Sequence, residues 1–306
     1  MKSFKRFFAG LRKFYQGNPA GIIGSSIVAL IVCACLAAPI LTDKNPNKRV
    51  ARGHQPPSAE LVLGSTRAGK DVYTQVLYGG RVSLLVAFSA ATITTLIAVS
   101  VGVTSGYFGG RIDETMMAIT NVMLVFPQLP LLLILAAFLG QVGPFVIALI
   151  LGLTSWPWGA RVMRSQTLAL RNKEFITAAE VMGESKWRII VVEIIPNLVS
   201  LLAGMFVGTS LYAIGAQAGL EFLGLGDPTV VSWGTMLYWA QSSAAFFVGA
   251  WWDFVVPGTI IALTGGGLAL INISIDQVSN PKLRTGRYLK IWRRMKAEVE
   301  AKRRQA

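Results

Sequence analysis

Residues 82–110 read VSLLVAFSAATITTLIAVSVGVTSGYFGG, an apolar run that holds no charged side chain between Arg81 and Arg111. A helix of about 20 apolar residues crosses a hydrocarbon core about 30 Å thick, so this run predicts one membrane span. Other windows have the same length and character. They lie between Asn18 and Asp43, between Glu193 and Glu221, and between Asp253 and Asp276.

The longest uncharged stretch lies between Glu114 and Arg161. It is about twice as long as one span requires. Residues 140–144, GQVGP, interrupt it with the glycine and proline chemistry of a turn. We therefore expect two helices joined by a tight turn, which brings the prediction to an all-α membrane protein with six transmembrane helices. Helices suit this setting because they satisfy their own backbone hydrogen bonds in lipid.

Composition supports a membrane protein. Hydrophobic residues make up 53% of the 306-residue chain and charged residues 14%, whereas soluble domains carry about 25% charged residues. This excludes a disordered chain and an ordinary cytosolic enzyme. A net charge of +14 would suit a nucleic-acid binder, but the charges cluster between the uncharged runs. We expect membrane lipid as a partner and no nucleic acid.

The basic residues predict the orientation. The arm before Asn18 holds five of them and no acid, the segment 161–193 holds six, and the tail after Ile275 holds ten. Six spans put all three on one side, which is the cytoplasm by the positive-inside rule, so we expect both termini there. The loop 43–81 is the exception, with seven bases and three acids on the predicted outer side. Long loops follow the rule less strictly.

The predicted outer segments hold two further features. Residues 64–71, GSTRAGKD, nearly match a phosphate-binding loop, but Asp71 stands where that loop requires Ser or Thr, so we expect no nucleotide site. Val72, Val76, Leu77 and Tyr78 fall on one helical face and predict a short interfacial helix before the next span, although a helix without a specific role fits equally well. Four tryptophans are expected to form an interfacial belt. These are Trp233, Trp239, Trp251 and Trp252.

No residue pattern indicates a metal site or a cofactor. His54 is the only histidine, and a metal site needs several ligands. Cys33 and Cys35 sit two apart in the first span, so they point in different directions and are expected to be buried thiols. We find no converging nucleophile and base, and we expect no enzymatic activity on this chain.

The segment between spans four and five is the most informative for function. From Phe175 to Met182 apolar residues and small alanines follow helical spacing. Gly183 suits the left-handed conformation that ends a helix. A second amphipathic piece follows over residues 186–195, and Pro196 suits the start of the next span. The sequence predicts two short helices that meet at Gly183 below the membrane.

Small side chains favour a docking role for this segment. Ala178 and Ala179 leave little bulk on one face, so another protein could approach closely. The connector runs for about 30 residues, and long loops in compact proteins are usually functional. We interpret it as a rigid knob that fits a partner's groove; the alternative is a solvated connector.

The chain resembles permease subunits of the peptide/nickel class of bacterial ABC importers. Their loop of the form E-A-A-x-x-x-G is matched by Thr177-Ala178-Ala179 and Gly183, followed by Ile194-Ile195-Pro196; Thr177 stands where the family has Glu. The family's other motifs occur in the expected order. They are matched at residues 63–71 (LGSTRAGKD), 77–84 (LYGGRVSL), 106–113 (GYFGGRID), 222–226 (FLGLG), 232–237 (SWGTML) and 280–284 (NPKLR).

This resemblance implies the type I ABC importer permease fold in three parts. Residues 1–81 would form a cytoplasmic arm, the first transmembrane helix and an external loop, residues 82–280 the transmembrane core with a coupling loop at 161–196, and residues 281–306 a basic cytoplasmic tail. The loop's short helix would dock onto an ATPase subunit. Its coupling residues would be Phe175, Thr177, Ala178, Ala179, Glu180, Met182, Gly183 and Pro196.

The resemblance also implies partners and a cargo. The partners would be a second permease, two ABC ATPase subunits that hold ATP and Mg²⁺, and an extracytoplasmic solute-binding protein, in a prokaryotic inner membrane. The cargo would be di- or oligopeptides, moved by alternating access. Oligosaccharides are the alternative cargo, because related permeases carry sugars. A stand-alone channel or an ion-coupled carrier is the alternative of another class.

Polar residues within the spans are candidates for the translocation path. The six predicted spans hold no Asp, Glu, Lys or Arg. Ion-coupled carriers usually need such residues in mid-membrane, so an energy source outside the membrane domain is favoured. Hydrogen bonding between helices is the alternative role for each candidate. The candidates are Asn121, Gln128, Gln217 and Asn272.

Overall fold

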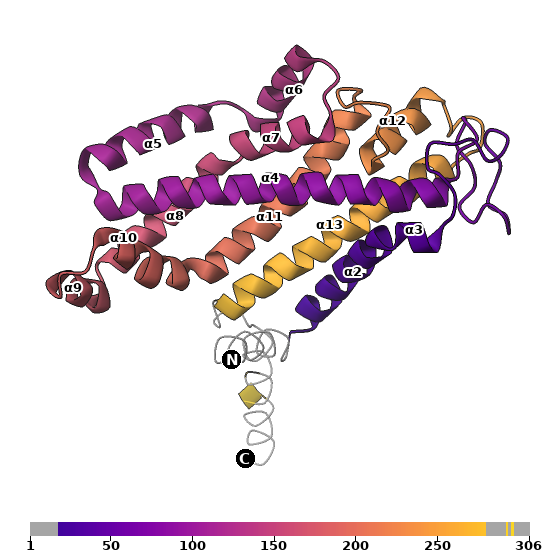
Figure 1. Ribbon diagram of the computed structural model, residues 1–306. Helices are drawn as coiled ribbons and strands as arrows, with labels where there is room; N and C mark the ends of the chain where they lie inside the picture. Colours follow the sequence, from indigo (N-terminus) through magenta and orange to yellow (C-terminus); the bar gives the residue numbers. More distant parts are fainter. Residues whose placement is uncertain (1–17, 280–291, 293–294, 297–306) are drawn as a thin grey trace.

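The computed structural model describes residues 18–279, 292, 295 and 296, so the predicted N-terminal arm and basic tail lie outside the described part. The predicted all-α fold is confirmed, with helices joined by turns and one long folded loop (Figure 1). The elements are α2 (Pro19–Leu36), α3 (Ala38–Leu41), α4 (Val72–Phe108), α5 (Gly110–Val125), α6 (Gln128–Leu139), α7 (Pro144–Thr154), α8 (Trp156–Arg171), α9 (Glu174–Val181), α10 (Lys186–Arg188), a π-helical segment (Ile189–Ile194), α11 (Ile195–Phe222), α12 (Trp233–Ser242) and α13 (Trp252–Ser279).

Four helical segments of the described chain are long and apolar enough to cross a membrane: α2, α4, the helix Lys186–Phe222 and α13. Two bent pairs bring the number to six if each pair forms one span. The pair α5 and α6 bends by 82°, and the pair α7 and α8 by 41°. Prolines stand at both bends, Pro127 before α6 and Pro157 in the first turn of α8, where their missing N–H interrupts the helix. The predicted turn at residues 140–143 separates the two pairs.

Helix α4 is continuous from Val72 to Phe108, and the predicted separate interfacial helix is wrong. The apolar face that suggested such a helix is buried inside the protein. Val72 and Val76 pack in one cluster with Trp233, whose Nε1 donates a hydrogen bond to the Val76 carbonyl at 3.0 Å. These contacts support a helix that continues through residue 81, the expected boundary between the external loop and the transmembrane core.

Small residues bring α4 and α8 close together. A Cβ atom added to Gly102 would lie 2.5 Å from Met163 Cβ, and one added to Gly106 would lie 2.8 Å from Thr167 Cβ. Side chains on both helices at this contact are fully buried, Met163 among them. Glycines spaced four apart let helix backbones approach within a membrane, and α4 and α8 use this spacing.

Replacing Gly102 by valine is expected to destabilise the protein by about 2–3 kcal/mol, because the added methyl groups overpack the contact between α4 and α8. Thermal unfolding of the purified chain in detergent measures the change. Gly215→Val is the matched control, since a Cβ atom at Gly215 meets nothing within 4 Å. Equal melting temperatures for the two variants would contradict the packing argument.

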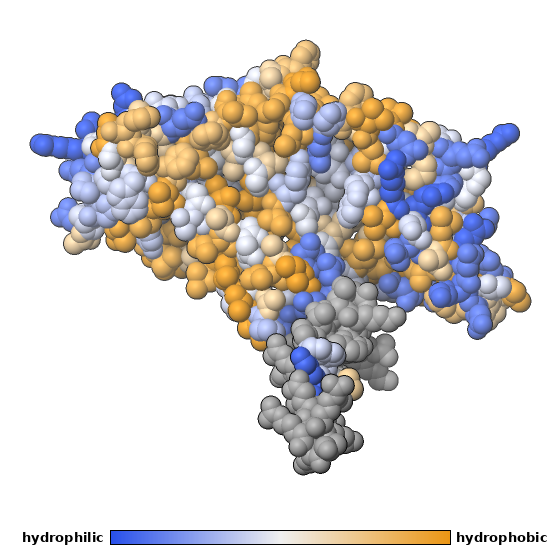
Figure 2. Space-filling model, turned by 180° about the vertical axis from the view of Figure 1, so that it is seen from behind, coloured by the Kyte–Doolittle hydropathy of each residue, from blue (hydrophilic) through white to orange (hydrophobic). Residues whose placement is uncertain are grey.

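The two ends of the molecule are polar and its middle is largely apolar, as Figure 2 shows for one face. Figure 1 places α9 and α10 at one end, and α3, the loop 42–71 and α12 toward the other. Exposed apolar side chains on the helices between the two ends include Leu85, Leu96, Phe138 and Leu263. This distribution suits a protein that crosses a bilayer with both ends in water.

At the end that holds α12, packing buries two of the predicted interfacial tryptophans and one charged residue. Trp233 and Trp252 are buried, so the predicted interfacial belt is wrong for them, while Trp239 and Trp251 remain half exposed. Glu221 lies within α11 and is only 3% exposed. The helices thus extend past the uncharged windows of the sequence and include charged residues near their ends.

Candidate functional site: an exposed helical knob and a polar cavity

Helix α9 and the turn after it form the knob that the sequence predicts. Glu174 stands in the first turn, where a negative charge favours the helix dipole. Gly183 has φ +82° and lets the chain reverse, with the Gly183 N–H donating to the Glu180 carbonyl at 3.0 Å and the Glu184 N–H to the Ala179 carbonyl at 3.1 Å. The glycine stop is therefore confirmed, and the chain continues directly into α10.

The inner face of α9 packs against the rest of the protein. Ile176 and Ala179 are buried in one cluster with Val103 and Tyr107 of α4 and with Ile189. The predicted small face shared by two alanines is wrong, because Ala178 is exposed while Ala179 points inward. Adjacent residues on a helix point about 100° apart, so one of two consecutive alanines can face the protein while the other faces outward.

The outer face of the knob exposes apolar side chains at a polar end of the molecule. Val181 is 83% exposed and Met182 74% exposed, and Phe175 and Trp187 are exposed as well. Val181 is not among the coupling residues that the sequence predicts, although its place one turn after Thr177 and Ala178 puts it on the same helical face. Val181 and Met182 border a shallow hollow of about 470 Å³. It is lined by Asn172, Glu174, Thr177, Ala178, Val181 and Met182.

Polar and aromatic contacts fasten the knob to the end of α4. The Tyr107 hydroxyl donates to Glu180 Oε1 at 3.1 Å, and Arg171 Cζ lies 6.0 Å from the centre of the Tyr107 ring. The next residue, Phe108, meets Trp187 edge to face with ring centres 5.9 Å apart. The pair Tyr107-Phe108 thus holds both short helices of the knob.

Pro196 lies in the first turn of α11, directly after the π-helical segment. The proline stands at the start of α11, as the sequence predicts, but no break precedes it, because a continuous helix runs from Lys186 to Phe222. A proline ring clashes with the carbonyl four residues earlier in a regular α-helix. The wider π-turn before Pro196 gives the ring room and keeps the helix continuous.

A cavity of about 940 Å³ opens between α8, α11 and α13. Its walls combine apolar and polar side chains, and Gln128 Nε2 donates to Ser155 Oγ at 2.8 Å on one of them. Among the residues that line the cavity, Asp276 is the one with a carboxylate. The polar side chains of the lining include Gln128, Gln166, Thr209, Asn272 and Asp276.

The four path candidates from the sequence occupy three different environments. Gln128 and Asn272 lie on the cavity wall. Asn121 is exposed on α5, where its Oδ1 accepts a hydrogen bond from Arg161 at 2.6 Å. Gln217 is buried and donates to Glu221 at 2.9 Å, away from the cavity. The structure therefore brings two of the four together.

Several motif residues hold the helices in place. Asp71 caps α4, with Oδ2 accepting from the Thr74 N–H at 3.0 Å. Asp113 of α5 receives two hydrogen bonds from Arg164 of α8, at 2.5 and 2.6 Å. Ser232 caps α12 by accepting from the Thr235 N–H at 3.0 Å. The first and last of these contacts cap single helices, and the pair Asp113–Arg164 joins α5 to α8, so these motif residues have structural roles.

Comparison with known proteins places this arrangement in a family. The family described as "Binding-protein-dependent transport system inner membrane component" matches residues 98–284. A putative peptide transport system permease protein of Brucella suis is 32% identical over 86% of this chain and 88% of its own length. The oligopeptide transport system permease protein OppC of Mycobacterium bovis is 34% identical over 84% and 91%, and OppC of Bacillus subtilis is 29% identical over 88% and 88%.

A solved structure supports the fold. The MetNI methionine ABC transporter in inward-facing conformations matches with a TM-score of 0.52 and 20% identity, over 68% of this chain and 95% of that chain. The fold is the type I importer permease fold. The chain belongs to the family of binding-protein-dependent transport system inner membrane components and is the membrane permease component of an ABC importer, not its ATPase.

Proposed function

We propose that this chain forms one half of a peptide import pathway and receives force from partner ATPases through α9. The observation that carries this proposal is the exposed apolar end of α9, where Val181 and Met182 face water. Large exposed apolar side chains at a polar end of a protein mark an interaction site. Relatives named as oligopeptide and dipeptide permeases support peptides as the cargo.

The proposed orientation puts α9 and both termini in the cytoplasm of a prokaryotic cell. The segment 161–193 around α9 carries six basic residues, which favours the inner side. Ser274 near the end of α13 donates to Asn18 before α2 at 3.1 Å, so the two terminal spans begin and end on the same side. An extracytoplasmic solute-binding protein would then deliver cargo at the opposite end.

The cavity supports a second permease as a partner. Its polar side chains, Gln128, Asn272 and Asp276 among them, line an open hollow in the middle of the helices. Polar groups exposed to hydrocarbon are costly, so this face needs water or another protein against it. A second permease would close the cavity into a pathway whose amide and hydroxyl groups can bond a peptide backbone.

The proposed mechanism is a rigid-body transmission. Closure of two ABC ATPases, which hold the ATP and Mg²⁺, would press on the outer face of α9. Because Ile176 and Ala179 are packed against α4, the knob cannot move without α4. The long helices would tilt between inward-open and outward-open arrangements, a shift between two packings of one bundle. The chain itself would carry out no chemical step.

Reconstitution tests the proposed function. Proteoliposomes would hold this permease with its second permease and ATPases, and uptake of labelled peptide and oligosaccharide libraries would be measured with the binding protein outside. We expect peptide uptake that requires ATP. Oligosaccharide uptake alone would assign the other cargo. Uptake by this chain alone, driven by an ion gradient without ATP, would overturn the importer proposal.

Replacing Tyr107 by phenylalanine is expected to lower the number of peptides moved per ATP hydrolysed severalfold. The change removes only the hydroxyl that donates to Glu180, and hydrogen bonds to charged groups contribute about 1.5–3 kcal/mol. The ring stays packed, so the fold should persist. Uptake and ATPase rate, measured together in proteoliposomes, give the ratio. Tyr78→Phe removes a hydroxyl near the other end of α4 and should leave the ratio unchanged; an unchanged ratio in Tyr107→Phe would refute the coupling role of this bond.

A further inference from the structure

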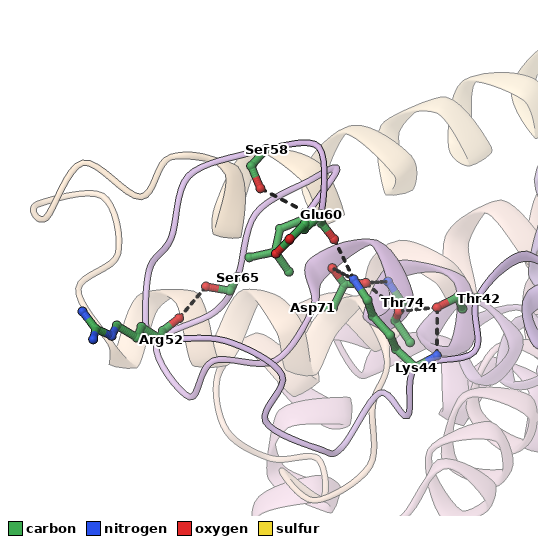
Figure 3. Close-up of polar contacts among 9 residues, drawn as sticks. Thr42, Lys44, Arg52, Ser58, Glu60, Ser65, Asp71 and Thr74 are labelled. Atoms are coloured by element: carbon green, nitrogen blue, oxygen red, sulfur yellow. Dashed lines mark hydrogen bonds and ion pairs between the residues drawn. The ribbon is translucent and has the colours of Figure 1, made fainter.

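The loop between α3 and α4 is folded into a fixed surface by its own hydrogen bonds (Figure 3). Ser65 Oγ donates to the Arg52 carbonyl at 2.8 Å and accepts from the Gln55 N–H at 2.9 Å. The His54 N–H donates to the Thr66 carbonyl at 3.1 Å. Residues 49–55 therefore run beside residues 65–69, although the two segments are distant in sequence.

The same loop is fixed to the helices beneath it. Asp71 Oδ2 accepts from Thr74 Oγ1 at 2.6 Å, and Lys44 Nζ lies 3.6 Å from Asp71 Oδ1 (Figure 3). On the other side, Trp252 Nε1 donates to the Ser65 carbonyl at 3.1 Å and ties the loop to the start of α13. The backbone of this loop thus keeps a fixed position relative to the bundle.

The fold gathers positive charge on the loop. The pairing of the two segments places Gly53, next to Arg52, beside Arg67, since a Cβ atom on Gly53 would lie 2.5 Å from the Arg67 carbonyl oxygen. It also places Arg49 beside Gly69, where an added Cβ atom would lie 3.0 Å from Arg49 Cγ. Burial and the positive charge of Arg67 both lower the pKa of His54. Lys48 and the three arginines are exposed, and among residues 18–279 the structure shows no ion pair for them. We call Lys48, Arg49, Arg52 and Arg67 the basic loop surface.

The basic loop surface stands beyond the bilayer. The uncharged part of α4 after Arg81 reaches Phe108, about 40 Å at 1.5 Å per residue, which exceeds a hydrocarbon core of about 30 Å. Arg81 is exposed and its Cζ lies 5.8 Å from the Tyr78 ring centre, a pair typical of the membrane interface. Asp71, the cap of α4, lies ten residues before Arg81, about 15 Å farther along the helix axis. Attraction to lipid headgroups falls off within about 8–10 Å, so lipid is a poor partner for this surface.

We propose that the basic loop surface docks an acidic face of the solute-binding protein. This inference rests on the proposed function, because it requires this end of the molecule to lie outside the cell. The family's description as binding-protein-dependent supplies the class of partner. Fixed like charges of this kind repel each other, and they steer an oppositely charged protein toward the permease by raising its association rate.

The test reverses the charges at Lys48, Arg52 and Arg67 and leaves Arg49, whose Nε donates to the Ala51 carbonyl at 3.0 Å. The assembled importer in neutral nanodiscs is mixed with its binding protein, and the association rate is followed by stopped flow at several salt concentrations. We expect the triple variant K48E/R52E/R67E to associate at least tenfold more slowly at low salt. We also expect the association rate of the wild type to fall as salt rises, and that of the triple variant to stay nearly constant.

A control and a second assay separate the possible outcomes. Glu60→Lys adds a positive charge to the same loop and should keep or raise the association rate. An unchanged association rate in the triple variant would overturn the proposal. The second assay measures binding to anionic vesicles, and a triple variant that loses this binding but associates normally with the binding protein would also overturn it. If the binding protein fails to stimulate ATP hydrolysis even in the wild-type importer, the proposed function itself is wrong. If the same concentration of binding protein stimulates the wild type and the triple variant equally, only the proposed docking surface is wrong.

Discussion

Replacing Val181 by aspartate is expected to lower ATP-driven peptide uptake at least tenfold. Val181 is 83% exposed in the permease, so the change should cost the isolated chain little stability. In the proposed complex the side chain would be buried against an ATPase. Burial of a valine contributes about 1.5–3 kcal/mol, and a carboxylate placed there must also lose its water. Each 1.4 kcal/mol corresponds to about a tenfold change in affinity.

Two measurements report this effect, the amount of ATPase that copurifies with the permease and the uptake in proteoliposomes. Val181→Thr keeps the shape of the side chain without a charge and should retain most uptake. Val62→Asp places the same charge at an exposed valine of the loop 42–71, at the opposite end, and should leave ATPase binding intact. Wild-type uptake by Val181→Asp would exclude this face of α9 from the ATPase contact.

Replacing Glu221 by leucine is expected to destabilise the protein by about 3 kcal/mol, because buried donors would lose their acceptor. The Glu221 carboxylate accepts from Gln217 Nε2 at 2.9 Å and from the hydroxyl of Ser232, the cap of α12. A Cβ atom on Gly226 would lie 2.6 Å from Glu221 Cγ, so the site is also tightly packed. The carboxylate thus fastens α12 to the end of α11.

Thermal unfolding in detergent tests this network, and a loss of about 3 kcal/mol should lower the melting temperature by about 5–10 °C. Glu221→Gln keeps the shape and one acceptor oxygen, so its melting temperature should lie between those of the leucine variant and the wild type. Glu114→Leu changes an exposed glutamate of α5 and should have little effect. A wild-type melting temperature for Glu221→Leu would show that the network does not stabilise the fold.

Local signals predicted much of the fold correctly. The uncharged windows mark the long helices, because a bilayer requires a minimum apolar length regardless of what each helix touches. The turn at residues 140–143 and the helix stop at Gly183 also follow from local chemistry, since few residues adopt the required backbone. Two of the four path candidates, Gln128 and Asn272, share the cavity wall in the structure.

Contacts between distant segments caused most of the errors. The sequence predicts Trp233 at the membrane interface, but in the structure this side chain is buried against α4. Val72 looked like part of a surface helix, but the same cluster covers it and extends α4. Gln217 looked like a residue of the path, but its amide bonds to Glu221. For Trp233 and Val72 the partners lie on other elements, and hydropathy along the chain carries no information about them. For Gln217 the partner lies one turn along the same helix, α11.

The sequence by itself determined that the chain is a polytopic helical membrane protein, where its apolar runs and turns lie, and which family's motifs it carries. Apolar length, turn chemistry and motif order are properties of consecutive residues, so they can be read along the chain. Only the tertiary structure decided that Val181 faces outward while Ala179 is buried, and that the chain at Gly53 lies beside Arg67. Those facts depend on how helices and loops far apart in sequence pack together.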